Sequence, residues 1–136
     1  MVGLFLLRLA VGLGGCVPVF AGLAGVVLGP GMLGPGMLAG GAPGLDAAGD
    51  SHFRYLSGLL LGIGLGFWST IPALPRRGAR FRLLTAIVVL GGLARLAALP
   101  LQGWPGWPMV AALGMELVVT PLLCLFQARF AAPQRD

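Results

Sequence analysis

The sequence predicts an all-α integral membrane protein, a bundle of four transmembrane helices that forms a single domain over residues 1–136. Two features of the composition favour this class. Hydrophobic residues make up 57% of the chain and charged residues only 10%, whereas charged residues make up about a quarter of a soluble domain. The mean hydropathy of +0.95 agrees. These values exclude a soluble globular enzyme and a nucleic-acid-binding module, and they make the lipid bilayer the first expected partner.

Four apolar stretches are long enough to cross a membrane. About 20 helical residues span a hydrocarbon core of about 30 Å. Helices are expected because no stretch alternates in polarity as the strand of a barrel does. The expected spans cover residues 2–28, 53–73, 83–99 and 108–127.

Proline residues mark the ends of these spans. Pro72 and Pro75 close the second span, and Pro100 closes the third. Pro108 opens the fourth at a first-turn position, where its missing N–H costs nothing. Pro18 lies inside the first span and predicts a kink there.

The distribution of basic residues predicts the orientation. Residues 76–82 contain four arginines and the C-terminal tail contains two, whereas the loop at 29–51 has two aspartates and no basic residue. Basic residues favour the cytoplasmic side of a membrane. We therefore expect a multi-pass protein of the bacterial inner membrane with its N- and C-termini in the cytoplasm.

The loop at 29–51 is rich in glycine and proline. Leu-Gly-Pro-Gly-Met occurs twice in tandem at residues 28–37, and this composition does not suit a helix or a central strand. The segment is either a flexible linker or a lid over a site.

The two cysteines predict no special chemistry. Residues 13–16 resemble the lipid-attachment box of bacterial lipoproteins, but apolar sequence continues well beyond Cys16, so we expect a retained helix. Cys16 and Cys124 form no C-x-x-C pair, and neither a disulfide nor a thiol-redox role is expected.

Three charged residues form the candidate site. Arg54 lies at the outer end of the second span, Arg95 in the third and Glu116 in the fourth. A charged residue costs about 2.5–3.5 kcal/mol on insertion scales and normally finds a partner inside the bundle. Arg95 reaches Glu116 if the third and fourth spans are neighbours. Three further residues lie at the expected periphery of this cluster: Asp50, His52 and Thr120.

Residue spacing predicts which residues share a helix face in each of these three spans. In the fourth span, Glu116, Thr120 and Cys124 recur every four residues and predict one polar stripe. In the second span, Arg54 is followed by a stripe of glycines that predicts close helix packing, made up of Gly58, Gly62 and Gly66. In the third span, Gly91 and Gly92 leave room for the Arg95 side chain.

Three interpretations of the cluster remain open. It is a structural ion-pair network that fixes helix register, a polar cavity whose guanidinium groups hold an anionic group, or a proton relay through Glu116. His52 has no second histidine or cysteine spaced to complete a metal site. No nucleophile–base pair or phosphate loop is present, so we expect no catalytic residue, no metal and no cofactor.

From residue 50 onward the chain resembles an uncharacterised bacterial four-helix membrane family, number 4345 among the domains of unknown function. The similar motifs are Asp50-Ser-His-Phe-Arg54, Gly91-Gly92-Leu-Ala-Arg95, Gly103-Trp-Pro105 and Glu116-Leu117-Val-Val-Thr-Pro121. The resemblance covers roughly residues 50–127, with weaker similarity around Arg8. It implies a four-helix bundle and no established activity.

These observations favour a non-catalytic accessory or scaffolding subunit of a membrane assembly, within a larger complex or a homo-oligomer. The alternative is a binder or carrier of an anionic or amphipathic ligand, such as a phospholipid or a quinone, at the cluster of Arg54, Arg95 and Glu116 in the outer half of the bundle. An enzyme lacks support because no nucleophile, metal set or redox pair is in evidence, and nucleic acid is not an expected partner.

Overall fold

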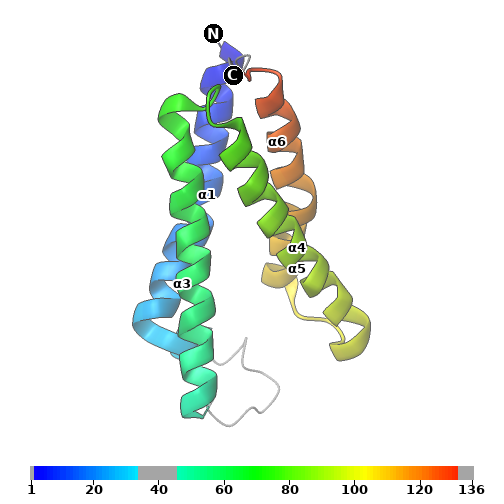
Figure 1. Ribbon diagram of the computed structural model, residues 1–136. Coiled ribbons are helices and arrows are strands. Elements are labelled where there is room, and N and C mark those ends of the chain that lie inside the picture. The colour runs from blue at the N-terminus through cyan, green and yellow to red at the C-terminus, as the bar shows by residue number, and fades with distance from the viewer. Residues whose placement is uncertain (1, 34–45, 132–136) are drawn as a thin grey trace. The chain divides into compact units, whose positions relative to one another are not determined.

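The computed structural model describes residues 2–33 and 46–131, and this part of the chain is helical without a strand (Figure 1). Its four long helical stretches are apolar and long enough to cross a membrane, and they cover Val2–Met32, Ala47–Ala73, Gly78–Gln102 and Trp107–Ala128. The all-α class with four membrane-spanning helices is therefore confirmed.

Short 3-10 or π segments interrupt or extend three of the four stretches. The elements in chain order are α1 (Val2–Leu28), the 3-10 turn η1 (Gly29–Leu33), α3 (Ala47–Thr70), the 3-10 turn η2 (Ile71–Ala73), α4 (Gly78–Gln102), α5 (Trp107–Gly114), the π-helical turn η3 (Met115–Val119) and α6 (Thr120–Ala128). The fourth span is thus a helix with one π turn in its middle.

Helix α3 begins six residues before the expected start of the second span. The side chain of Asp46 accepts a hydrogen bond of 2.8 Å from the Gly49 N–H, as an N-cap does. Apolar sequence marks only the part of a helix that crosses hydrocarbon, and this helix continues into a polar first turn.

The first copy of the 28–37 repeat forms η1, whereas the expectation for the second copy lies outside the described residues.

The prediction that Pro100 closes the third span is wrong. Helix α4 includes Pro100 and ends at Gln102. Gly103 ends it with a φ of +85°, and the Gly103 N–H donates to the Leu99 carbonyl over 2.9 Å. A proline in the last turn removes one N–H and leaves this glycine termination intact. Pro108 lies in the first turn of α5, as predicted.

The chain forms two compact units. Unit 1 consists of Met1–Val11 with Ser69–Asp136, and unit 2 consists of Gly12–Trp68. In unit 2 the rest of α1 packs against α3. A Cβ atom on Gly22 would lie 2.5 Å from the backbone nitrogen of Leu61, so the two helix backbones meet there. This is the close approach that small residues permit between membrane helices.

Gly58 and Gly62 of the predicted stripe are not the glycines that permit this approach. Among the described residues, no atom lies within 4 Å of a Cβ built on Gly62, and Gly58 has only an ordinary contact of 3.9 Å with Val26. A strict four-residue spacing drifts about 40° per step around a helix of 3.6 residues per turn. A mixture of three- and four-residue steps stays on one face, and that face of α3 carries Arg54, Ser57, Leu61 and Gly64.

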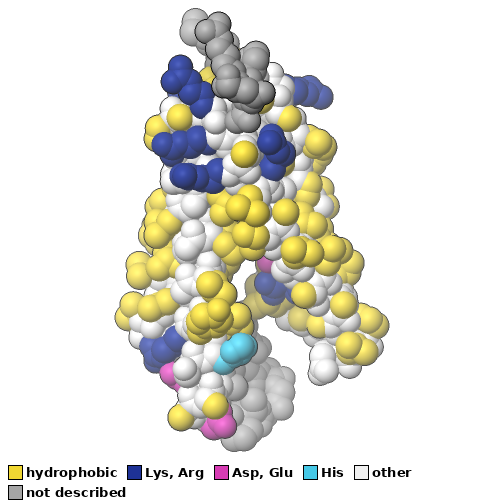
Figure 2. All heavy atoms as spheres, in the orientation of Figure 1, with side chains coloured by type: hydrophobic (Ala, Val, Ile, Leu, Met, Phe, Trp, Pro, Cys, Tyr) yellow, Lys and Arg dark blue, Asp and Glu magenta, His cyan; other side chains and the backbone are white. Residues whose placement is uncertain are grey.

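In unit 1, α4 lies beside η3 and α6, and α5 contacts α4 (Figure 1). Gln127 of α6 is fully buried, and its Nε2 donates to the Leu74 carbonyl over 2.9 Å. A Cβ on Gly3 would lie 3.0 Å from the Phe130 ring. The start of α1, the turn before α4 and the end of α6 therefore meet at one end of this unit, where Figure 2 shows basic side chains.

Replacing Gly22 with alanine should destabilise the protein by about 1–3 kcal/mol, the usual cost of overpacking. The added methyl group has no space because the neighbouring atoms belong to the backbone of α3. Gly62→Ala is the matched control, since it adds the same group to a helix at an open position and should be neutral or stabilising by up to about 1 kcal/mol. Unfolding by SDS in mixed micelles, followed by circular dichroism, measures both. Equal stability of the two variants would contradict the packing of α1 on α3.

Candidate functional site

Arg95 and Glu116 form a bidentate ion pair in unit 1. The Arg95 Nε donates to Glu116 Oε2 over 3.1 Å, and its Nη2 donates to Oε1 over 3.0 Å. This parallel arrangement is the strong form of the arginine–carboxylate interaction. The two side chains keep 37% and 20% of their surface exposed. The pair links α4 to the π turn η3 and holds both charges together inside the membrane-spanning part of the chain.

The π turn that carries Glu116 has a local cause in the sequence. Pro121 has no N–H, and in a regular helix its ring would clash with the carbonyl group of Leu117. The wider turn at Met115–Val119 accommodates this proline. The carbonyl of Met115 accepts both the Thr120 N–H, five residues on, and the Thr120 hydroxyl over 2.8 Å. Such π turns are frequent at functional sites.

The π turn lies within the predicted polar stripe on the fourth span, and the stripe stays a prediction. Thr120 is the first residue of α6, directly after the π turn. Its hydroxyl donates a hydrogen bond within its own span, to the Met115 carbonyl. Pro121, which lies inside the expected span, is the signal in the sequence for this π turn.

Gly92 makes the approach of α4 to the π turn possible. A Cβ atom on Gly92 would lie 2.7 Å from Leu117 Cδ2 and 2.9 Å from Glu116 Cβ. Gly91 has no atom within 4 Å of such a Cβ among the described residues. The prediction that both glycines make room for Arg95 is therefore wrong, since only Gly92 makes room, and it does so for Glu116 and its neighbour.

Arg95 has a third contact that the sequence analysis does not anticipate. Its Nη1 donates to the thioether sulfur of Met109 over 2.9 Å. Beside this contact lies a cavity of about 130 Å³, which we call the Arg95 cavity. Its walls are formed by Arg95, Ala98, Leu99, Gln102, Gly103, Pro105 and Met109.

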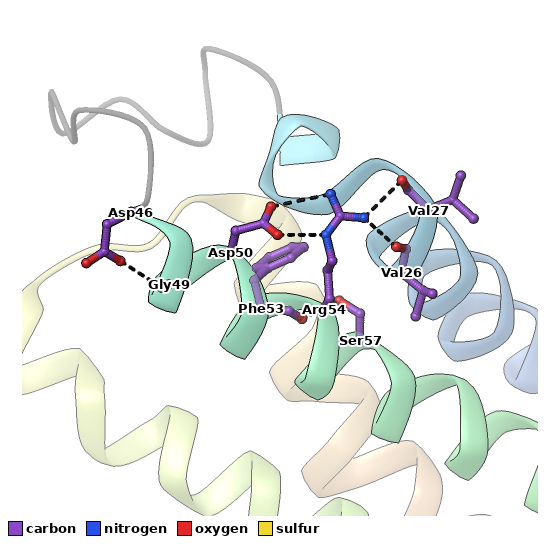
Figure 3. Close-up of polar contacts among 8 residues, drawn as sticks. All are labelled: Val26, Val27, Asp46, Gly49, Asp50, Phe53, Arg54 and Ser57. Atoms are coloured by element: carbon purple, nitrogen blue, oxygen red, sulfur yellow. Dashed lines mark hydrogen bonds and ion pairs between the residues drawn. The ribbon is translucent and has the colours of Figure 1, made fainter.

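Arg54 belongs to unit 2 and has a different set of partners (Figure 3). Its Nε donates to Asp50 Oδ2 over 2.8 Å. Its Nη1 donates to the carbonyls of Val26 and Val27 over 2.6 and 3.1 Å. These carbonyls belong to the last turn of α1, where the final four carbonyl groups lack partners within the helix.

Arg54 therefore caps the C-terminus of α1, where a cation is favoured by both hydrogen bonding and the helix dipole. Gly29 ends this helix with a φ of +63°, and a Cβ there would lie 2.6 Å from Arg54 Nη2. Only glycine suits this position, because the residue there must adopt a positive φ and must also leave space for the guanidinium group.

The remaining peripheral residues have local surroundings in unit 2. Asp50 is the carboxylate partner of Arg54. His52 is exposed, and its ring centroid lies 6.4 Å from that of Tyr55. The structure thus joins Arg95 to Glu116 and Arg54 to Asp50 within their own units, while a shared cluster of Arg54, Arg95 and Glu116 stays a prediction.

Replacing Gly92 with alanine should destabilise the protein by about 1–3 kcal/mol, because the new methyl group would collide with the turn that carries Glu116. Gly91→Ala is the matched control at an adjacent open position and should be neutral or slightly stabilising. SDS unfolding of the two variants measures the difference. A Gly91 variant at least as unstable as the Gly92 variant would contradict the observed face of α4.

Comparison with known proteins supports the resemblance seen in the sequence. No curated protein and no solved structure matches the chain. A family model described as a domain of unknown function, DUF4345, matches residues 6–127, which include Arg54, Arg95 and Glu116. The chain therefore belongs to the DUF4345 family.

Proposed function

We propose that this protein is a non-catalytic accessory or scaffolding subunit of a membrane assembly. In this proposal it spans the bacterial inner membrane four times, with the arginine-rich turn at 76–82 and both termini in the cytoplasm. An even number of spans supports a common side for the termini. The four arginines of this turn support the cytoplasmic assignment of that side.

The observation that carries the proposal is the partial exposure of the Arg95–Glu116 pair. The two side chains are 37% and 20% exposed, on helices that also expose many large hydrophobic side chains. No residue in the most apolar window of Trp107–Ala128 is buried, and hydrophobic side chains cover much of the face seen in Figure 2. Ionised groups open to lipid are costly, so a helix of a partner protein, or of a second copy, would stabilise the pair by covering it.

Photo-crosslinking at Val118 tests this proposal. Val118 is 56% exposed in the π turn that also carries Glu116. Tyr55 of α3 is 62% exposed and serves as the control position. A benzophenone side chain at 118 should yield an adduct with the same protein that co-purifies in stoichiometric amount by native mass spectrometry. A protein that purifies alone, with only lipid adducts at both positions, would contradict the accessory role.

The proposed orientation has its own test. With Cys16 and Cys124 replaced by alanine, a single cysteine at Ala79 in the arginine-rich turn should resist an impermeant thiol reagent applied from the periplasmic side. A cysteine at Leu101, at the opposite end of α4, should react, since Leu101 is 77% exposed. Labelling at 79 with protection at 101 would reverse the topology.

A second candidate function is supported by the Arg95 cavity. Its walls combine one arginine and one glutamine with apolar groups, as the walls of small-molecule sites commonly do. In this alternative the protein binds or carries an anionic or amphipathic ligand, such as a phospholipid or a quinone.

A further inference from the structure

The Arg95 cavity lies where α4 ends and α5 begins. Four of its wall residues, Arg95, Ala98, Leu99 and Gln102, share one face of α4 because they follow three- and four-residue steps. Gly103 and Pro105 come from the short connection. The cavity volume of about 130 Å³ far exceeds the roughly 15 Å³ that one water molecule requires on this kind of measure, so it has room for the end of a larger molecule.

Arg95 keeps hydrogen-bond donors that can serve a ligand there. A guanidinium group has five N–H donors, and Nε and Nη2 each use one on Glu116. Nη1 donates to the sulfur of Met109, which is a weak acceptor. An oxygen acceptor that entered the cavity would form a stronger hydrogen bond with Nη1 than this thioether does.

Charge balance indicates which kind of oxygen the cavity favours. Glu116 already neutralises Arg95 through two hydrogen bonds. Gln102 is the other polar side chain in the wall, and it is uncharged. An anionic headgroup would therefore bring an uncompensated negative charge close to Glu116, which is costly at low dielectric constant. A neutral acceptor such as a carbonyl oxygen avoids this cost.

We propose that the Arg95 cavity binds the carbonyl end of a neutral amphiphile, with Arg95 Nη1 donating to the carbonyl oxygen and the apolar part lying against Ala98 and Leu99. This inference rests on the second candidate function and names its ligand class. The carbonyl group could belong to a quinone ring or to a glycerol ester of a lipid, and these two sources share the same recognition chemistry.

Tryptophan fluorescence provides the binding test. Trp104 and Trp107 lie next to the cavity in sequence, with ring centroids 5.2 Å apart. The detergent-solubilised protein is titrated with ubiquinone-1 and the quenching is recorded. Dioctanoylglycerol, a neutral ester, and decanoate, a carboxylate, are then added as competitors. We expect ubiquinone-1 to quench the fluorescence saturably and decanoate not to displace it, whereas dioctanoylglycerol displaces it only if a lipid ester also fits the cavity.

Three variants connect the signal to the cavity. Ala98→Leu fills the cavity and should weaken binding by at least about tenfold, whereas Ala97→Leu adds the same group at an exposed position outside the wall and should bind normally. The double variant R95L/E116L removes the donor without leaving an unpaired charge and should also weaken binding about tenfold.

The outcomes separate the ligand class from the binding function. Stronger competition by decanoate than by dioctanoylglycerol, abolished by Ala98→Leu, would overturn the neutral class and leave a binding function in place. Quenching that is identical in the Ala98→Leu and Ala97→Leu variants would overturn both the neutral ligand class and the binding function. Competition by dioctanoylglycerol would identify a lipid ester as a sufficient source. Saturable ubiquinone-1 binding that neither dioctanoylglycerol nor decanoate displaces would identify the quinone ring.

Discussion

Pairing of charged side chains within an apolar chain is the constraint on which the site depends. Arg95 satisfies it through Glu116, and the pair requires the close approach that Gly92 permits between α4 and the π turn. Arg54 satisfies it through Asp50 and the final carbonyls of α1. In a bilayer no water is present to replace these partners. Arg54 and Arg95 therefore each fix the position of a second helix as well as that of their own.

Much of the helical architecture could be predicted from the sequence, because crossing a hydrocarbon core demands a length and an apolarity that few other structures require. Val2–Leu28 matches the expected first span at both ends. The contact between Arg95 and Glu116 was also foreseeable, since a short connection after Gln102 makes the two helices neighbours. Charge and connectivity alone indicated that pair.

The details of register could not be predicted in the same way. Four-residue periodicity placed the packing face of α3 on Gly58 and Gly62, whereas real packing follows Ser57 and Leu61 because a helix has 3.6 residues per turn. The π turn depends on a single proline and on the neighbouring structure that accommodates it. The carbonyl partners of Arg54 leave no trace in a sequence, since every residue carries a carbonyl group.

The most direct test of this account is a double-mutant cycle on Arg95 and Glu116. The unfolding free energy in mixed micelles is measured for Arg95→Gln, Glu116→Gln and the double variant. If the pair joins α4 to the π turn, each single change leaves a charge without its partner, and the double variant should be more stable than the sum of the two losses predicts by about 0.5–3 kcal/mol. Strictly additive losses would show that the two side chains do not interact and would contradict the account.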